Sequence, residues 1–169
     1  IMSPFNSLFK RVVDIFVCLL LLPFVLLVVV LAMPFLKFKP LMFVSRYDLT
    51  GRRLKIPQLA VDYAKGGFLF QTGLYKLPEI FGVLVGKQSF VGPAPLIKRE
   101  LEYYKDSGDT FRNVKPGITG LWQVSDYGYF REEQRLSLDM MYVVQWSPMM
   151  DLDIVVHSLI KGLVSLCKP

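Results

Sequence analysis

The sequence predicts an α+β protein that is mainly helical, with an N-terminal re-entrant membrane helix and a small cytoplasmic domain that carries interfacial amphipathic helices. Residues 15–36 contain no charged side chain. Beyond them, apolar residues recur at helical spacing, and residues 41–56 have the pattern of an extended pair. A hydrophobic content of 53% and a mean hydropathy of +0.40 exceed those of an ordinary soluble domain. We therefore divide the chain into a membrane-associated part, residues 1–40, and a cytoplasmic domain, residues 41–169.

The charge balance narrows the classes of partner. A formal charge of +6 and a pI near 9.3 suit anionic lipid headgroups, phosphorylated ligands or nucleic acid. Nucleic acid is the weakest of these, because Lys and Arg are scattered and no nucleic-acid-binding motif accompanies them. Cys18 and Cys167 form neither a disulfide framework nor a metal cluster, so both are expected to be reduced thiols.

The apolar run of residues 15–36 is about as long as a helix needs to cross the hydrocarbon core, which takes about 20 residues. Pro23 lies near its middle and disfavours helical geometry at Leu22, so we expect a break at these two residues. Basic residues flank the run on both sides, which removes the usual signal for direction across the bilayer. These flanking residues are Lys10, Arg11, Lys37 and Lys39. A bent helix that enters and leaves by the same face is therefore preferred, and a single spanning helix remains the alternative.

The next part of the chain predicts short elements. Residues 41–56 read as a strand or extended pair around a turn at Thr50 and Gly51, and a loop follows at Gly66 and Gly67. Residues 74–86 have helical spacing and end at Gly86. Residues 89–95 are expected to form a rigid turn, and residues 96–105 a polar helix.

The last part predicts a loop and two longer helices. Residues 115–125 are rich in glycine and are expected to be a loop, whereas residues 131–145 have apolar side chains along one side of a helix. Ser147 is a good N-cap with Pro148 at the first helical position. The helix that follows, to about residue 166, is broadly apolar, so we expect it to lie against the membrane surface.

Several segments together resemble a known family. Residues 89–93 read Ser-Phe-Val-Gly-Pro, and residues 115–125 read Lys-Pro-Gly-Ile-Thr-Gly-Leu-Trp-Gln-Val-Ser. With the Lys-Arg pair and Asp14 before a proline-containing apolar segment, they resemble the bacterial sugar transferases, which are monotopic phosphoglycosyl transferases. The resemblance implies a re-entrant helix and transfer of a phosphosugar from a UDP-sugar to polyprenol phosphate. It further implies an Asp nucleophile, a Glu that helps hold Mg²⁺, and cations that neutralise the diphosphate.

The chain departs from this family where the chemistry is expected. The family's Asp-Glu dyad lies in Leu-Asp-Glu-Leu-Pro, and the matching text places Tyr75 and Lys76 at the dyad. Phe70 and Gln71 replace an Arg-Lys pair, and Ala94 replaces an arginine between two prolines. Residues 58–60 replace a Lys-Phe-Arg segment, and Leu22 replaces the serine that usually precedes the central proline. Loss of all these groups together argues against the family's mechanism.

Each remaining candidate has a structural alternative. Tyr75 could attack phosphorus if Lys76 lowered its pKa, and Glu79 could supply a displaced carboxylate. We favour structural roles for all three, because an acid in a first helical turn is favourable whatever the function. His157 stands alone, without a second histidine, and is expected to be a satisfied interfacial residue and not a base.

A second set of residues is expected to bind ligand. Lys115 and Thr119 could hold a nucleotide or sugar phosphate, although a glycine-rich turn can equally be scaffold. Arg135 and Asp139 are four residues apart, a spacing that suits a structural ion pair, whereas the resemblance implies a place near the active site. The sequence therefore proposes Lys115, Thr119, Arg135 and Asp139 as ligand-binding residues and predicts no metal ligands.

The leading hypothesis is a catalytically inactive member of this family that acts as a scaffold or regulator in bacterial exopolysaccharide or other glycan synthesis. It needs no cofactor, and Mg²⁺ is expected only if the protein is active. Its expected partners are membrane lipid and either an active glycosyltransferase or a second copy of the chain, at the cytoplasmic face of the inner membrane. The alternatives are an active transferase with an altered site, and a module that senses a nucleotide sugar or lipid phosphate.

Overall fold

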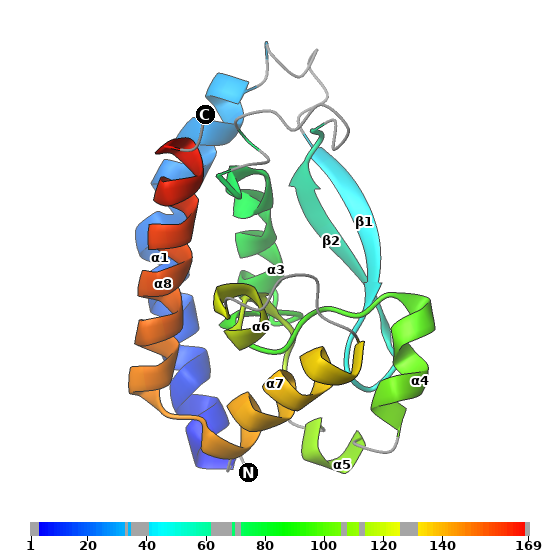
Figure 1. Cartoon of the computed structure of the whole chain (residues 1–169). Helices are drawn as coiled ribbons and strands as arrows, with labels where there is room; N and C mark the ends of the chain where they lie inside the picture. The colour runs from blue at the N-terminus through cyan, green and yellow to red at the C-terminus, as the bar shows by residue number, and fades with distance from the viewer. Residues whose placement is uncertain are drawn as a thin grey trace.

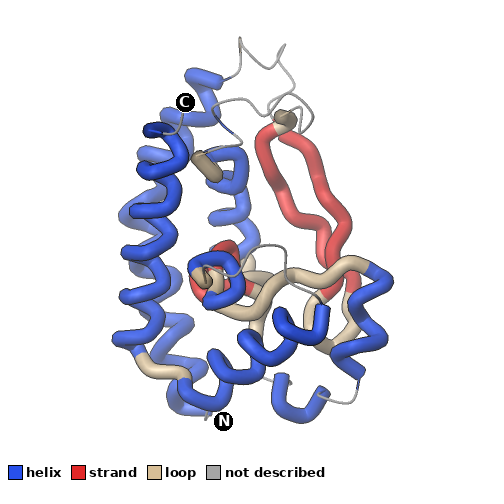
Figure 2. The backbone as a smooth tube through the Cα atoms, viewed as in Figure 1, coloured by secondary structure: helices blue, strands red, loops and turns tan. Residues whose placement is uncertain are grey.

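The computed structural model describes residues 4–32, 34, 41–61, 69, 72–105, 108–111, 114–125 and 132–167. It is mainly helical with a few short strands, which agrees with the predicted α+β class (Figures 1 and 2). The elements of the first half are α1 (Pro4–Ala32), β1 (Leu41–Tyr47), β2 (Arg53–Leu59), the 3-10 helix η2 (Leu74–Glu79), α3 (Ile80–Leu84) and β3 (Ser89–Val91). Those of the second half are the 3-10 helix η3 (Lys98–Glu100), α4 (Leu101–Tyr104), α5 (Gly108–Phe111), β4 (Gly117–Thr119), α6 (Leu121–Val124), α7 (Glu132–Gln145) and α8 (Pro148–Cys167).

Helix α1 contains the described part of the apolar run up to Ala32. It is the one helix in the described residues that is long and apolar enough to cross a membrane, from Phe5 to Leu31. The helix continues through Pro23, so the expected break at Leu22 and Pro23 does not end it. Whether the chain re-enters the same face of a membrane stays a prediction, as does the division of the chain at residue 40.

One face of α1 is packed against the rest of the chain. Cys18, Val25 and Val29 are buried there, at spacings that place them on one side of a helix. They share a hydrophobic core with Leu59 of β2 and Ile80 of α3. Other faces of α1 expose a set of large apolar side chains that includes Phe5, Phe16, Leu20 and Leu31. An apolar surface of this extent is typical of a helix that meets lipid.

The expected extended pair is an antiparallel hairpin. Strands β1 and β2 pair from Leu41 opposite Leu59 to Tyr47 opposite Arg53. At the turn, the Asp48 carboxylate accepts hydrogen bonds from the backbone N–H of Thr50 and of Arg52. This confirms the prediction for the hairpin. The expected loop at Gly66 and Gly67 lies outside the described residues.

A second small sheet was not expected. Strands β3 and β4 pair in parallel, with Ser89 opposite Gly117 and Val91 opposite Thr119, in segments expected to be a turn and a loop. The backbones approach so closely that a Cβ on Gly117 would lie 2.2 Å from the Gly92 nitrogen. Glycine is therefore required here for packing. Three-residue strands are too short to show an alternating pattern, which explains why the prediction was incomplete.

The predicted helices are present with small changes. The helix expected over residues 74–86 is η2 followed by α3, and Gly86 closes it with φ +85°. Helices α7 and α8 have the expected bounds to within a few residues, and Ser147 Oγ accepts a hydrogen bond from the Met150 N–H as the predicted cap. A second core lies beneath α4, α5, α7 and α8. Its buried members include Leu96, Tyr104, Phe111, Tyr142 and Ile154.

Helices α1 and α8 run along the same side of the molecule (Figure 1). Lys10 of α1 forms an ion pair with Asp151 of α8, whose carboxylate also accepts hydrogen bonds from Tyr142 and Trp146. Farther along, both helices line one cavity through residues such as Val25 and Leu159. Since α8 also exposes a row of apolar residues, these two helices present adjoining apolar surfaces.

Candidate functional site

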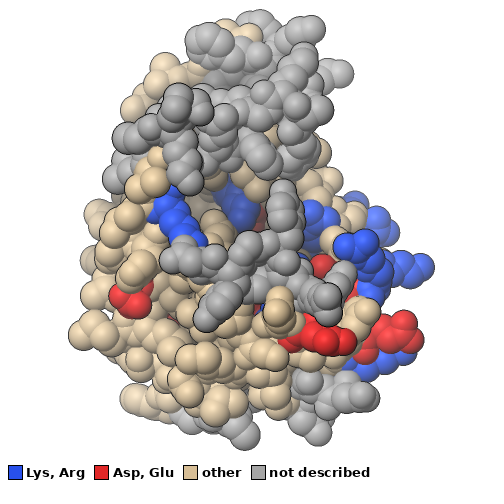
Figure 3. All heavy atoms as spheres, viewed as in Figure 1, with Lys and Arg blue, Asp and Glu red and all other residues tan. Residues whose placement is uncertain are grey.

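A cavity of about 210 Å³, the central pocket, lies among the hairpin, η2, α6 and α7. The residues of this pocket that bear on its chemistry are Arg46, Gln58, Tyr75, Lys76, Glu79, Ala94, Glu100, Ile118, Trp122 and Arg135. Basic side chains are visible in the hollow on this face of the molecule (Figure 3). The structure therefore brings the two dyad positions, Tyr75 and Lys76, together with Glu79 and Arg135. For Arg135, a place near the active site was one of the two alternatives that the sequence left open.

Lys76 is held firmly in this pocket. Its ammonium donates a hydrogen bond to Gln123 Oε1 at 3.3 Å and lies 5.5 Å from the ring centroid of Trp122. It also lies 5.9 Å from the centroid of the Tyr75 ring. Burial lowers the pKa of Lys76, and the Arg46 cation lowers it further, whereas Glu79 acts to raise it. The position where the resemblance expects a metal-binding carboxylate thus carries an anchored cation.

Glu79 has both carboxylate oxygens occupied. Oε1 accepts a hydrogen bond from Gln58 at 2.7 Å, and Oε2 accepts one from Gln88 at 3.0 Å. The residue is only 2% exposed, and this burial raises the pKa of Glu79 despite the opposing influence of Lys76. Two neutral amide donors from distant parts of the chain are what a buried structural carboxylate requires.

Arg135 and Trp122 form the opposite wall. Arg135 pairs with Glu100 at 2.8 Å, and its guanidinium lies 5.8 Å from the ring centroid of Trp122. The indole of Trp122 therefore has two cations over it, Lys76 and Arg135. Its N–H has no hydrogen-bond partner within the described part of the chain. The ion pair considered between Arg135 and Asp139 is instead one between Arg135 and Glu100.

Asp139 lies behind this pocket and does not line it. It is 1% exposed, and Oδ2 accepts hydrogen bonds from the Tyr104 hydroxyl at 2.8 Å and the Ala94 N–H at 3.3 Å. Oδ1 has no partner among the residues described here. Burial raises the pKa of Asp139 to about 7. This residue supports the backbone around Ala94, where the resemblance expects an arginine.

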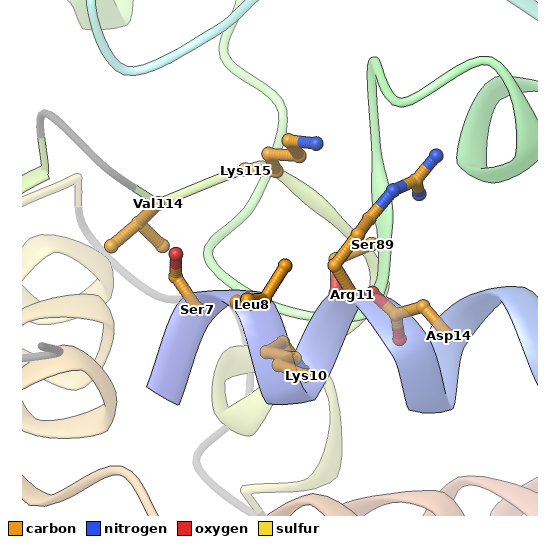
Figure 4. Close-up of a pocket in the computed structure, with 8 residues that line it drawn as sticks. All are labelled: Ser7, Leu8, Lys10, Arg11, Asp14, Ser89, Val114 and Lys115. Carbon is orange, nitrogen blue, oxygen red and sulfur yellow. Dashed lines mark hydrogen bonds between the residues drawn. The ribbon is translucent and has the colours of Figure 1, made fainter. Parts of the chain in front are cut away.

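The other two predicted ligand-binding residues lie elsewhere. Lys115 lines a separate cavity at the start of α1, the basal pocket, with Arg11, Asp14 and Ser89 (Figure 4). Thr119 lines a third cavity, the apolar groove, where its hydroxyl lies 2.5 Å from that of Ser158. The residues proposed from the sequence as one ligand-binding set are therefore divided among three cavities and a buried site.

Sequence reasoning missed Arg46 as a member of the central pocket. It lies on β1, opposite Leu54 of β2, and nothing in an isolated strand sequence indicates which basic residue faces a cavity formed by later elements. His157 lies on the exposed side of α8 and contacts Asp153, away from the central pocket. Its expected place at the membrane interface stays a prediction.

The donor set does not fit the Mg²⁺ that the resemblance implies. In the described ranges, no group of three His, Cys, Asp or Glu side chains lies close enough to hold a metal ion. Both oxygens of Glu79 accept amide hydrogen bonds, and Glu100 Oε2 accepts from Arg135 and from the Ile97 N–H. Lys76 adds a positive charge that disfavours a divalent cation. We therefore derive no step that uses a metal.

Comparisons with known proteins point to one family. The model of the bacterial sugar transferase family matches residues 62–165. The undecaprenyl-phosphate galactose phosphotransferase of Salmonella typhimurium is 42% identical over 92 residues, which cover 54% of this chain and 19% of that protein. The UDP-glucose:undecaprenyl-phosphate glucose-1-phosphate transferase of Klebsiella pneumoniae is 31% identical over 97% of this chain and 42% of that protein.

A third relative is the exopolysaccharide production protein ExoY of Sinorhizobium fredii, 37% identical over 53% of this chain and 40% of that protein. The chain thus spans between 19% and 42% of the length of these three relatives. The family model nevertheless covers more than half of the chain, and it includes residues 89–93 and 115–125, two of the segments that carry the resemblance. The chain belongs to the bacterial sugar transferase family.

Proposed function

We propose that this chain is a catalytically inactive sugar transferase that serves as a membrane-bound scaffold or regulator in bacterial exopolysaccharide or other glycan synthesis. The observation that carries the proposal is the anchored ammonium of Lys76 in the central pocket, beside Tyr75 at the nucleophile's position. The family's mechanism needs an anionic nucleophile and a metal-binding carboxylate at these two positions. Tyr75 supplies a phenol and Lys76 supplies a cation, so neither requirement is met.

The surroundings of Tyr75 support inactivity. A phenol has a pKa near 10, so it needs a base or a strongly cationic contact at its hydroxyl to become a nucleophile at neutral pH. The Lys76 ammonium lies over the Tyr75 ring, and the carboxylate of Glu79 already accepts two amide hydrogen bonds. An active transferase that uses Tyr75, Lys76 or Glu79 is the alternative that the experiment below tests.

The membrane arrangement that we propose is monotopic, at the cytoplasmic face of the inner membrane. A helix that projects freely across a bilayer would expose all its faces to lipid, whereas Cys18, Val25 and Val29 of α1 pack on β2 and α3. Spanning would carry those attached elements, with their polar backbone, toward the hydrocarbon core. The re-entrant arrangement avoids that cost, and it requires α1, which is continuous through Pro23 in the structure, to bend at Leu22 and Pro23 in the membrane so that both flanks lie on one side.

A second candidate function, sensing of a lipid phosphate, is favoured by the way two cavities meet. The apolar groove lies between α1 and α8 and shares Lys76 and Ile118 with the central pocket. A lipid with an apolar chain in the groove would bring its phosphate toward Lys76. As a sensor, the protein would bind the lipid phosphate without transferring a sugar phosphate to it. A neutral polyprenol that stabilises the protein as much as its phosphate would contradict it.

The proposed partner is an active glycosyltransferase of the same assembly pathway or a second copy of this chain. Loss of chemistry with retention of the family's fold leaves binding as the function that the remaining surface can perform. Sedimentation of the purified protein in detergent at several concentrations distinguishes self-association from a monomer that requires a different partner.

The test of inactivity is release of UMP. The purified protein in lipid nanodiscs is incubated with UDP-sugars, Mg²⁺ and polyprenol phosphate, with an active relative as the positive control. We expect UMP release no faster than in the protein-free sample. Release that is lost in Tyr75→Phe but kept in Tyr103→Phe, an exposed tyrosine outside the central pocket, would overturn the proposal.

A further inference from the structure

The basal pocket is a cavity of about 220 Å³ at the start of α1, on a different part of the chain from the central pocket. Arg11 and Lys115 reach toward it from two elements, and Leu8 and Val114 form apolar walls (Figure 4). Lys115 was expected from the sequence to bind ligand, but the proposed function above does not use this cavity.

Two cationic groups converge at one place. A Cβ built on Gly86 would lie 3.2 Å from Arg11 Nη2 and 3.5 Å from Lys115 Nζ, so both groups lie beside the same small volume. The Arg11 guanidinium is fixed there, because it donates hydrogen bonds to the carbonyl oxygens of Val83 and Leu84 at the end of α3. Its remaining N–H groups and the Lys115 ammonium are close enough to contact one anion together.

The neighbouring carboxylates do not neutralise both cations. Asp151 is paired with Lys10, and Asp14 accepts hydrogen bonds from the Ser89 hydroxyl at 2.6 Å and the Phe90 N–H at 3.4 Å. Within the described residues, Lys115 has no hydrogen bond or ion pair. Burial lowers its pKa, and the Arg11 cation adds to this against the opposing effect of Asp14.

The net charge of the side chains around the basal pocket favours one class of anion. When all five groups are ionised, Lys10, Arg11 and Lys115 carry three positive charges and Asp14 and Asp151 carry two negative charges, which leaves one positive charge. Burial raises the pKa of Asp14 and lowers that of Lys115, so these two shifts act on the balance in opposite directions. A singly charged anion matches this balance better than a nucleoside diphosphate, which would meet the Asp14 carboxylate with excess negative charge. A phosphodiester carries one charge and presents two oxygens, one for each cation.

The position of the basal pocket along α1 indicates which kind of molecule would present a phosphodiester to it. Arg11 and Asp14 are the last charged residues before the uncharged run that begins at Ile15, and Leu8 is 64% exposed beside them. This end of α1 is therefore where a membrane helix would meet lipid headgroups. We propose that Arg11 and Lys115 bind a singly charged phosphodiester, the group that a phospholipid headgroup presents at this boundary.

The first test measures protection of Lys115. The protein is placed in nanodiscs of phosphatidylglycerol or of an uncharged glycolipid, and acetylation of each lysine is followed by mass spectrometry. We expect Lys115 to react about tenfold more slowly in phosphatidylglycerol, because a bound phosphodiester withdraws its ammonium from reaction. Lys98, an exposed lysine that lines none of the three cavities, should react at the same relative rate in both.

A third sample distinguishes the source of the phosphodiester. It contains the uncharged nanodiscs with soluble glycerophosphoglycerol. Protection of Lys115 in this sample would support the site with a soluble ligand, and protection only in phosphatidylglycerol would support the site with a lipid. Equal reactivity of Lys115 in all three samples would overturn the proposal.

The second test uses matched variants. Native mass spectrometry of the detergent-solubilised protein measures the affinity for phosphatidylglycerol in the wild type, Lys115→Gln and Lys98→Gln. We expect Lys115→Gln to bind about tenfold more weakly, as the loss of a charged hydrogen bond predicts, and Lys98→Gln to match the wild type. Lys115→Arg should retain most of the affinity. Wild-type affinity in Lys115→Gln would contradict the role of this residue.

Discussion

Lys76 and Glu79 lie three residues apart on η2, yet their surroundings give them different roles. Lys76 points its charge into the central pocket beside Trp122, whereas Glu79 is enclosed by the amides of Gln58 and Gln88. The sequence suggested a structural role for Glu79 because an acid suits a first helical turn. The structure supports the role for another reason, since the two amides are 21 and 9 residues away and no local pattern reveals them.

Glu79→Ala is expected to destabilise the protein by about 2 to 5 kcal/mol, because it removes the acceptor of two buried amide hydrogen bonds. Glu79→Gln should cost less than about 1 kcal/mol, since Gln88 can rotate its amide and accept a hydrogen bond from the new side chain. Chemical denaturation measures both values. A Gln variant as unstable as the Ala variant would show that the negative charge itself is required.

Asp139 is expected to make stability depend on pH. Burial raises its pKa from the ordinary value of 3.8 to about 7, so the folded state binds its proton more tightly than the unfolded state. Between pH 4 and 7 the folded state therefore holds more protons, and the free energy of unfolding decreases as pH rises through this window. The decrease due to Asp139 should be on the order of a few kcal/mol.

Asp139→Asn tests this effect, because the amide keeps an acceptor for Tyr104 and does not titrate. The variant should lose less stability than the wild type between pH 4 and 7 in denaturation experiments. Asp153→Asn, which changes an exposed carboxylate on α8, provides the matched control and should follow the wild-type curve. If the free energies of unfolding of Asp139→Asn and the wild type changed equally between pH 4 and 7, Asp139 would not be the cause of the pH dependence.

At the level of elements, the contact between α1 and α8 depends on a partly buried ion pair. The side chains of Lys10 and Asp151 are 10% and 19% exposed. A double-mutant cycle with Lys10→Met and Asp151→Asn should give a coupling energy of about 1 to 3 kcal/mol. The exposed pair of His157 and Asp153 on α8 should give no measurable coupling in the same experiment. Equal coupling in the two pairs would contradict a role for burial.

The two flanks of α1 are expected on the same side of the membrane. Single cysteines replace Phe5 and Thr50, which are both exposed, in a background of Cys18→Ser and Cys167→Ser. Both should react with a membrane-impermeant maleimide in inside-out vesicles and remain unlabelled in right-side-out vesicles. Labelling of either position from the periplasmic side would show that the chain spans the bilayer.

The elements that the sequence predicts well are those long enough to show a period. Helices α7 and α8 have a repeated apolar face, and the hairpin has a clear turn at Thr50 and Gly51. The β3–β4 pair has only three residues in each strand, and its pairing depends on a close approach of Gly92 to Gly117. Such a contact is long-range, so local periodicity does not predict it.

Across the whole molecule, the chain retains motifs of the family and carries Tyr75 and Lys76 where the resemblance expects the Asp-Glu dyad. The structure brings Tyr75, Lys76, Glu79 and Arg135 into one pocket. The sequence places the first three in one short segment, and it left open whether Arg135 pairs with Asp139 or lies near the active site. It did not separate Lys115 and Thr119 from them, because both belong to one continuous motif. Lys115, which lies just before β4, lines the basal pocket, whereas Thr119 at the end of β4 lines the apolar groove. This separation is visible only in the folded chain.

We propose that no sugar phosphate is transferred through this chain. The resemblance implies a covalent intermediate in which the nucleophile is bonded to the sugar phosphate, and a search for this intermediate tests the proposal directly. The protein in nanodiscs is incubated with UDP-sugars and Mg²⁺, without lipid acceptor, and its intact mass is measured beside that of an active relative. We predict an unchanged mass for this chain and an increase by one sugar phosphate in the relative. The same increase in this chain, located on Tyr75 by peptide fragmentation, would contradict the account.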